Sequence, residues 1–374
     1  MGHKPRGQII LPTPMNRRYA LKKLGQAGLA TAASNLLLLE DEFSIRGQHY
    51  VWLHGNKDKS AQDWQNLFTR IKQTGFKGIL INAGPDLLKK VIPIAKTQSL
   101  EVHAWMWTLN QPGEKQLQAE KPELYSVSRE GKSVLDAPPY VGYYRWLCPS
   151  RPGTLDFLHQ KVAGLLAVEG LDGIHLDYVR YCDVILPRAL WDKYGLVQKE
   201  ELPPYDYCYC QVCRTNFKTL AGIDPLEMED PSANQAWKQY RYDQVTRIVN
   251  AISGQVHAEN KILSAAVFPY PDLARKLVRQ SWDDWRLDKV FPMIYHSFYN
   301  EGLNWIKRST ASGVNDIANR FTLHTGLFMP ALQKGTQLQK AVQRSRQGGA
   351  EGIAIFNGDN LPAEVWEHLQ DALW

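Results

Sequence analysis

Short apolar runs alternate with longer amphipathic segments over most of the chain, from about residue 47 onward. The runs have the length and composition of buried β-strands, and the segments between them are long enough for helices. This alternation is typical of an α/β fold with parallel strands. Eight such runs are present, at Tyr50–His54, Gly78–Asn82, Glu101–Thr108, Gly173–Tyr181, Ile262–Tyr270, Lys289–Tyr299, Phe321–Met329 and Gly352–Asn357.

A helix is predicted after each run. Eight strands that are each followed by a helix give the count of a (β/α)₈ TIM barrel, and no GxGxxG turn of the kind found in open dinucleotide-binding sheets follows the first run. We therefore predict a single α/β barrel domain over residues 47–374. Its helices are expected at Ala61–Thr74, Asp86–Thr97, Gly153–Val168, within Trp237–His257, and at Pro271–Trp285, Leu303–Asn319, Thr336–Gln347 and Pro362–Leu373.

Two connections are long for such a fold. Residues 109–152 follow the third strand, and residues 182–236 follow the fourth. Loops that leave the carboxyl ends of barrel strands build the active site, so long loops there predict a walled cleft.

The composition changes this picture little. Hydrophobic residues make up 44% of the 374 residues and charged residues 22%, as in an ordinary globular protein. The net charge of +6 is spread along the chain, which gives no support to a nucleic-acid partner. The 12 tryptophans and 17 tyrosines include candidates for stacking on sugars, although core packing accounts for most of them. The sequence indicates neither an organic cofactor nor an oligomeric state.

Residues 1–46 lack the barrel pattern. Arg17 and Arg18 precede a mildly apolar stretch, Leu24–Leu39, with small residues at Ala30–Ala32. The segment resembles a twin-arginine export signal, which predicts a periplasmic or secreted protein; the alternative is an amphipathic first helix. The stretch is too short and too poor in large side chains for a membrane span, so none is expected in the mature chain.

The fourth run, GIHLDYVRY at Gly173–Tyr181, contains the leading catalytic candidate. Because alternate residues of a strand share a face, Ile174, Leu176 and Tyr178 are expected to pack against the helices. His175, Asp177 and Val179 are then expected inside the barrel, with Asp177 nearest its mouth. A carboxylate there is costly to bury unless it is paired or functional. A structural role for Asp177, bonded to Arg180 or to loop amides, is the alternative.

The same run resembles the signature of the family-10-like glycoside hydrolases, a family of glycosyl hydrolase-like barrels. Five further motifs match in order over residues 48–358: Cys148–Ser150, Cys208–Arg214, Leu263–Pro269, Gln280–Trp285 and Phe291–Tyr295. The resemblance implies a TIM barrel that cleaves glycosidic bonds, with a poly- or oligosaccharide substrate.

Glycosidic cleavage usually needs two carboxyl groups. Barrel glycosidases that pair acids of the fourth and seventh strands would place the second one near Leu323–Leu327, where this chain has none. Glu301 after the sixth strand and Asp272 after the fifth are the preferred partners for Asp177. Asp359 after the eighth strand is the third choice. Each is also explained as a loop or helix-capping residue, Asp272 in particular.

Several polar and aromatic residues are predicted to project into the same cleft and bind the sugar. Trp105 and Trp107 share a face of the third strand with His103, so at least one tryptophan should reach the mouth; filling of the barrel interior is the competing role. The remaining candidates for substrate binding are Asn82, His175, Arg180, Tyr295, His296 and Asp359.

The five cysteines are Cys148, Cys182, Cys208, Cys210 and Cys213. Disulfides are the default in an exported protein, but C-x-C-x-x-C is awkward for pairing and suits a tetrahedral zinc site with a fourth ligand from elsewhere. A Cys-Pro before one helix and a C-x-C-x-x-C leading into another resemble the zinc-holding pieces of family 42 β-galactosidases. That resemblance implies one structural zinc on Cys148, Cys208, Cys210 and Cys213, with Cys182 as the alternative fourth ligand. Disulfides and free thiols stay open.

Three functions compete at this point. The first is a glycoside hydrolase outside the cytoplasm, the second a non-catalytic carbohydrate-binding barrel, and the third another barrel hydrolase such as a deacetylase or amidohydrolase. The third lacks support, because the metal-binding His-x-His that such enzymes often carry after the first strand is replaced by His54-Gly55-Asn56. Fold alone does not choose among the three.

Overall fold

Eight parallel strands form a closed barrel in the computed structural model, which describes residues 47–373. The strands follow one another in chain order around the barrel, and β1 pairs with β8 to close it. The predicted (β/α)₈ TIM barrel is confirmed, whereas the predicted leader, 1–46, lies outside the described residues. The strands are β1 (Tyr50–His54), β2 (Gly78–Asn82), β3 (Glu101–Trp107), β4 (Gly173–Asp177), β5 (Ile262–Val267), β6 (Lys289–Pro292), β7 (Thr322–Phe328) and β8 (Gly352–Phe356).

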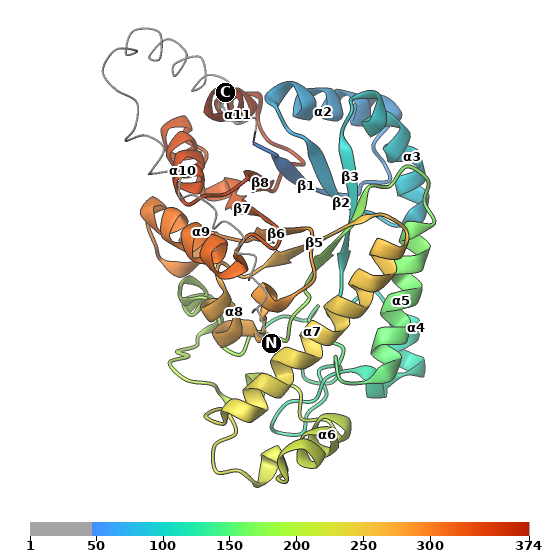
Figure 1. Cartoon of the computed structure of the whole chain (residues 1–374), viewed down its shortest axis with the longest axis vertical. Helices are drawn as coiled ribbons and strands as arrows, with labels where there is room; N and C mark the ends of the chain where they lie inside the picture. The colour runs from blue at the N-terminus through green and yellow to red at the C-terminus, as the bar shows by residue number, and fades with distance from the viewer. Residues whose placement is uncertain (1–46, 374) are drawn as a thin grey trace, which may run out of the picture. The chain divides into compact units, whose positions relative to one another are not determined.

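Helices surround the strands, and two of them, α4 and α6, lie within the long connections that follow β3 and β4 (Figure 1). The predicted fifth helix ends early, because Arg279 adopts a left-handed conformation with φ 58° directly after α8. The helices are α2 (Ala61–Thr74), α3 (Pro85–Thr97), α4 (Lys115–Glu120), α5 (Pro152–Leu166), α6 (Gln211–Ala221), α7 (Gln235–Ala258), α8 (Pro271–Val278), α9 (Leu303–Ile317), α10 (Gly335–Gln347) and α11 (Ala363–Leu373).

The strands separate two apolar cores. The larger one lies between the outer strand faces and the helices, and it contains Ile174 and Leu176 of β4. The smaller one fills the barrel interior and is dominated by aromatic rings, including Trp52, Trp105 and Phe291. The alternation of residues along β3 and β4 assigns each side chain to one of these cores, as a period of two requires.

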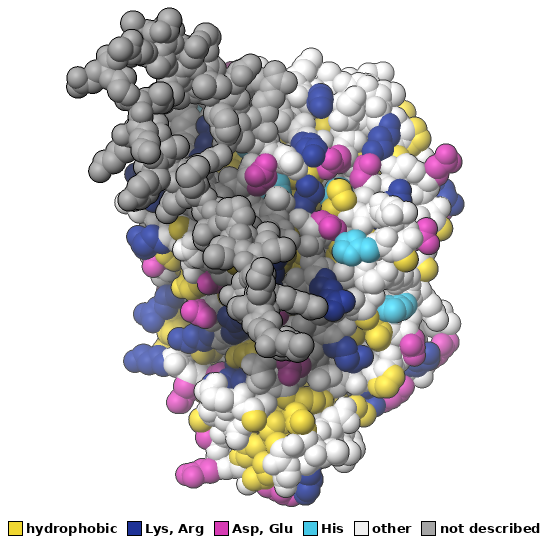
Figure 2. All heavy atoms as spheres, viewed as in Figure 1, with side chains coloured by type: hydrophobic (Ala, Val, Ile, Leu, Met, Phe, Trp, Pro, Cys, Tyr) yellow, Lys and Arg dark blue, Asp and Glu magenta, His cyan; other side chains and the backbone are white. Residues whose placement is uncertain are grey.

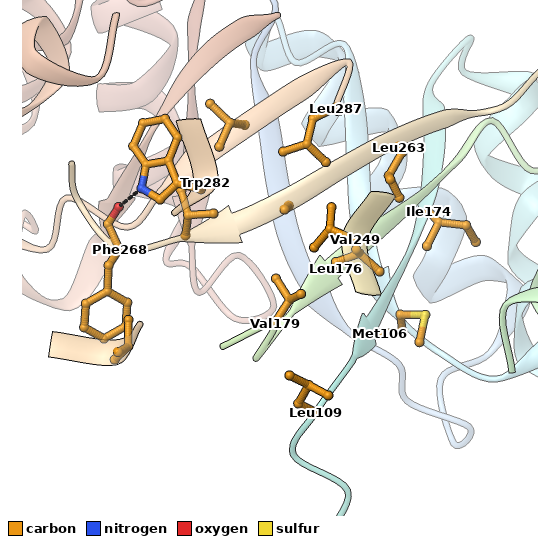
Figure 3. Close-up of a cluster of buried hydrophobic side chains, with 14 of the residues drawn as sticks. Met106, Leu109, Ile174, Leu176, Val179, Val249, Leu263, Phe268, Trp282 and Leu287 are labelled. Carbon is orange, nitrogen blue, oxygen red and sulfur yellow. Dashed lines mark hydrogen bonds between the residues drawn. The ribbon is translucent and has the colours of Figure 1, made fainter. Parts of the chain in front are cut away.

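The strand alternation ends at Asp177, four residues earlier than predicted. Tyr178 has a left-handed backbone with φ 49°, and this reverses the sides of the residues that follow. Val179 therefore lies in the outer core near Leu176, as Figure 3 shows. Tyr178 instead lines a cavity at the barrel mouth. The predicted positions of Tyr178 and Val179 were wrong for this reason.

One glycine marks a close approach where the barrel closes. Gly352 begins β8, and a Cβ atom added there would lie 2.0 Å from the carbonyl oxygen of Gln48. A larger residue at position 352 would require a shift of the backbone. Glycine therefore allows the start of β8 to pack against Gln48, which precedes β1.

Apolar side chains gather on the surface at the end of the molecule where α6 lies (Figure 2). Leu220, Ile223 and Leu226 are exposed there. None of the helices within residues 47–373 combines the length and the apolar character that crossing a membrane requires.

Candidate functional site

A cavity of about 370 Å³ opens at the carboxyl ends of the strands, where active sites of this fold lie. Its walls come from the ends of five strands, β1, β3, β4, β5 and β8, from the segment that follows β6, and from the long connections after β3 and β4. Most of its lining is aromatic, which suits the apolar faces of sugar rings. The lining residues are Trp52, His54, Trp105, Trp107, Tyr140, Tyr143, Tyr144, Asp177, Tyr178, Arg180, Asp183, Leu186, Pro187, Leu190, Lys193, Tyr194, Ala266, Phe268, Met293, Tyr295, Phe298, Tyr299 and Phe356.

Asp177 is the last residue of β4, and its carboxylate lies in this cavity. One carboxylate oxygen, Oδ2, accepts a hydrogen bond from the indole Nε1 of Trp105 at 3.0 Å. The other, Oδ1, accepts from the backbone N–H of Tyr178 at 2.6 Å. Burial raises the pKa of Asp177 above its ordinary value, although both hydrogen bonds and the charge of Arg180 oppose the shift. The Asp177 carboxyl group therefore stays protonated to a higher pH than the carboxyl group of a free aspartate does.

Asp183 is a second carboxylate in the cavity lining, and it was not among the predicted site residues. Its Oδ2 accepts hydrogen bonds from the Tyr144 hydroxyl at 2.9 Å and from Arg180 Nη1 at 3.1 Å. Arg180 is itself buried, with its guanidinium 4.7 Å from the Trp146 ring centre. The sequence showed only that an acid lies six residues after Asp177. Strand periodicity does not predict the conformation of the loop that contains it.

The predicted carboxylate partners lie outside this cavity lining. Glu301 is exposed and contacts Arg308 at 3.3 Å. Asp272 lies in the first turn of α8, where its side chain is 92% exposed and pairs with Arg275 at 3.5 Å. It does not cap the helix, because the N-cap is Tyr270. Neither carboxylate lines the cavity that contains Asp177.

The aromatic candidates reach the cavity. Trp105 and Trp107 both line it, and Trp107 packs on Tyr178 with the ring centres 4.6 Å apart. Tyr295 is also in the lining, nearly parallel to Phe356 at 6.0 Å. Ring faces at these positions form the surfaces on which a sugar could stack.

Three polar candidates lie outside the cavity lining. His103 and His175 are fully buried in the barrel interior, where His175 Nε2 accepts from Trp52 Nε1 at 2.9 Å and Nδ1 contacts Ser264 Oγ at 2.9 Å. Because Trp52 lines the cavity, His175 lies beneath the cavity floor, and burial lowers its pKa. Asn82 instead donates through Nδ2 to the carbonyl oxygen of Trp105 at 2.9 Å.

The last two candidates, His296 and Asp359, are also absent from the cavity lining. His296 begins a short 3₁₀ helix, His296–Tyr299, and is absent from the cavity lining. Asp359 follows β8 and hydrogen-bonds to His54, which does line the cavity and which the sequence analysis passed over. The two residues are 305 positions apart, so no local pattern connected them.

Four cysteines converge outside the cavity lining. Cys148, Cys208, Cys210 and Cys213 are buried, and their sulfur atoms all lie within 4.8 Å of one another. The sulfur atoms of Cys148 and Cys213 are 3.4 Å apart, and no disulfide joins any of the five cysteines. Sulfur atoms at the corners of a tetrahedron with metal bonds near 2.3 Å would be about 3.8 Å apart, so this cluster is consistent with a metal site. Cys182 lies outside the cluster.

The cluster joins the two long connections that wall the cavity. Cys148 precedes α5, whereas Cys210 is the N-cap of α6 and Cys213 lies in its first turn. Cys208 Sγ also accepts the backbone N–H of Val127 at 3.3 Å. The wall residues from both connections are therefore anchored at one point.

Comparisons with known proteins agree with this architecture. The sequence model of the family described as Glycosyl hydrolase-like 10 matches residues 57–341. No curated protein matches the chain. Among solved structures, the glycoside hydrolase domain of PgaB (BpsB) from Bordetella bronchiseptica is similar, with a TM-score of 0.63, 14% identity and coverage of 87% of this chain and 98% of that one.

Two further structures share the fold. A β-galactosidase from the haloarchaeon Halorubrum lacusprofundi matches with a TM-score of 0.59 and 10% identity, over 87% of this chain and 57% of that one. The catalytic domain of a β-amylase from Paenibacillus polymyxa matches with a TM-score of 0.57 and 12% identity, over 87% and 97% respectively. At these identities the likeness is one of fold.

Proposed function

The chain belongs to the glycosyl hydrolase-like 10 family, and on that premise we propose that it is a glycoside hydrolase that cleaves a poly- or oligosaccharide. The observation that carries the proposal is the position of Asp177 in an aromatic cavity at the carboxyl ends of the strands, with its pKa raised by burial. An aromatic cavity binds sugar rings, and a carboxyl group of raised pKa can supply the proton that cleavage needs.

Asp177 is the general acid in this proposal. It gives its proton to the glycosidic oxygen as the bond between that oxygen and the anomeric carbon breaks. Water then adds its hydroxyl group to the anomeric carbon, and the remaining proton of that water returns to the Asp177 carboxylate. The Trp105 indole and the Tyr178 backbone N–H then bond to the carboxylate that is left behind, since both already point at its oxygens. These donors hold the carboxylate in position until it is protonated again.

Asp183 is the partner that the cavity offers. Arg180 and Tyr144 anchor it on the cavity wall, so its environment differs sharply from that of Asp177. Two carboxyl groups held in contrasting environments are the usual means of dividing acid and carboxylate roles in glycosidases. We assign Asp183 the charge that stabilises positive charge on the sugar in the transition state.

A polysaccharide panel tests the proposal. Wild-type protein should release reducing sugar from at least one member, and Asp177→Asn should lower turnover by at least about 10³-fold without loss of fold. Asp272→Asn is the matched control, since it makes the same change on an exposed side chain outside the cavity lining. A sugar that binds equally well to wild type and Asp177→Asn, with no release by either, would favour the non-catalytic binding barrel.

We also propose that the cysteine cluster holds one structural zinc ion. Four buried thiols with converging sulfurs support this, and four thiolate ligands leave no open position for catalysis by the metal. Elemental analysis of protein purified without chelator should find one zinc per chain, and Cys148→Ser should lower that content. Wild-type protein that contains no zinc would refute the assignment.

The proposed site of action is outside the cytoplasm. The paired Arg17 and Arg18 before an apolar stretch support export. Replacement of both arginines by lysine should retain the protein in the cytoplasm, as measured by fractionation of cells that express the full chain. Unchanged distribution would count against twin-arginine export.

A further inference from the structure

The cavity contains a histidine that the proposed chemistry does not use. His54 ends β1 and lines the cavity with about half of its side chain exposed, and the carboxylate of Asp359 after β8 holds it from behind. Asp359 Oδ2 lies 2.7 Å from His54 Nδ1, and Asp359 Oδ1 accepts the backbone N–H of His54 at 2.8 Å. One carboxylate thus fixes both the ring and the backbone of His54.

The other ring nitrogen is left for a ligand. Nδ1 is engaged by Asp359, and Nε2 has no hydrogen-bond partner among residues 47–373. Two aromatic rings flank the imidazole, with ring centres at 5.1 Å for Trp105 and 5.9 Å for Phe356, and both rings also line the cavity. A polar atom framed in this way by apolar walls is typical of a site that orients a ligand.

We propose that His54 is a sugar-binding residue, oriented by Asp359, whose Nε2 hydrogen-bonds to a hydroxyl group of the substrate. This inference rests on the proposed glycoside hydrolase function and adds the contact that positions the sugar. A hydroxyl group both donates and accepts. It can therefore donate to Nε2 when the ring is neutral and accept from it when the ring is protonated.

The position of Trp105 connects this contact to the reaction. The Trp105 indole packs beside His54 and donates through Nε1 to Asp177. A sugar held by His54 against Trp105 would therefore lie next to the proposed acid. Asp359 acts only through His54 and is a positioning residue, which changes the role that the sequence analysis gave it.

A merely structural role is the competing explanation, since the pair also joins the ends of β1 and β8. Binding measurements separate the two. The probes are D-glucose, D-galactose and N-acetyl-D-glucosamine, added stepwise to the full-length protein. The signals are the NMR resonances of His54 Cε1–H and Trp105 Nε1–H, which report on the two sides of the same pocket.

At least one probe should shift both resonances in a saturable manner. His54→Phe retains an aromatic ring beside Trp105 and should weaken that probe about tenfold, as loss of one ligand hydrogen bond does. Asp359→Asn should weaken binding of that probe less. Asp58→Asn, which changes an exposed acid in the loop that follows His54, should leave binding unchanged.

Three results overturn the inference, and the third also removes the proposed function. A probe that shifts Trp105 but not His54, or that binds His54→Phe as tightly as wild type, defeats the inference and leaves the glycosidase proposal standing. If no probe shifts either resonance and the polysaccharide panel also gives no product, the inference fails together with the proposed function.

Discussion

Replacing Trp105 by phenylalanine should raise the pKa of Asp177 further. The substitution removes the Nε1–H group that donates to Asp177 Oδ2 at 3.0 Å, and phenylalanine keeps most of the apolar wall that buries the carboxyl group. Because that hydrogen bond favours the ionised carboxylate, its loss favours the protonated form. The pKa therefore moves up.

The size of the shift follows from the bond. A hydrogen bond to a charged group contributes about 1.5–3 kcal/mol, and one pKa unit corresponds to about 1.4 kcal/mol. The Asp177 side chain is only partly buried and retains its hydrogen bond from the Tyr178 N–H, so the lower end of this energy range applies. We expect an upward shift of about one unit.

The assay is the pH dependence of kcat/KM on a substrate from the panel. A general acid must be protonated, so activity is lost as pH rises through its pKa, and the alkaline limb of the profile should move up by about one unit. If Asp177 acted as base or nucleophile, the acidic limb would move up instead. The limb that moves therefore identifies the role.

Trp107→Phe is the matched control, because Trp107 lines the same cavity but makes no hydrogen bond to Asp177. Its profile should keep both limbs in place, even if binding weakens. A Trp105→Phe profile that coincides with the wild-type profile would show that Trp105 does not tune Asp177, and the proposed acid would lose its main support.

Three further predictions concern stability. Burial lowers the pKa of His49 to about 4 and of His324 to about 3, below the ordinary 6.5, so the unfolded chain takes up protons first. Their contribution to the free energy of unfolding is complete above pH 6.5 and falls below it. Each histidine should cost up to about 3 kcal/mol between pH 6.5 and 4, because one pKa unit corresponds to about 1.4 kcal/mol. Urea titrations between pH 7 and 4 measure this loss, and His324→Gln should make the free energy of unfolding depend less on pH. Gly352→Ala should cost at least about 2 kcal/mol because the new Cβ meets Gln48, whereas Gly113→Ala, with open space around it, should cost less than about 1. Arg180→Met leaves Asp183 buried without its cation and should lower the free energy of unfolding by about 3–5 kcal/mol in the same assay. The exposed Arg188→Met should lower it by less than about 1 kcal/mol. Equal losses for the two arginine variants would show that the ion pair with Asp183 does not stabilise the fold.

The barrel was predictable because strand periodicity is a local property. Alternation along β3 and β4 correctly assigned Trp105 and Asp177 to the interior side, since every second side chain of a strand shares a face. The point where alternation stops was not predictable. Tyr178 adopts a left-handed conformation that is more common for glycine or asparagine, so the residue type at this position did not predict the turn.

The site was predictable only in part, because most of its contacts join distant segments. The convergence of the four cysteines was anticipated from their spacing and from the resemblance to family 42, and it is present. Asp183 was missed because the path of its loop depends on Arg180 and Tyr144. Glu301 and Asp272 were chosen for their places after strands, which fixes the face of the barrel but not the direction of a side chain.

The bond between His54 and Asp359 also has a consequence for the order of folding. It joins residues 305 positions apart, at the first and last strands, and can form only when β8 docks on β1. Contacts of such long sequence separation carry a large loop-closure cost and form late. A chain still on the ribosome, or one truncated before β8, would hold His54 without its carboxylate. The orientation of His54 for sugar binding would then be completed only at the final step of barrel closure.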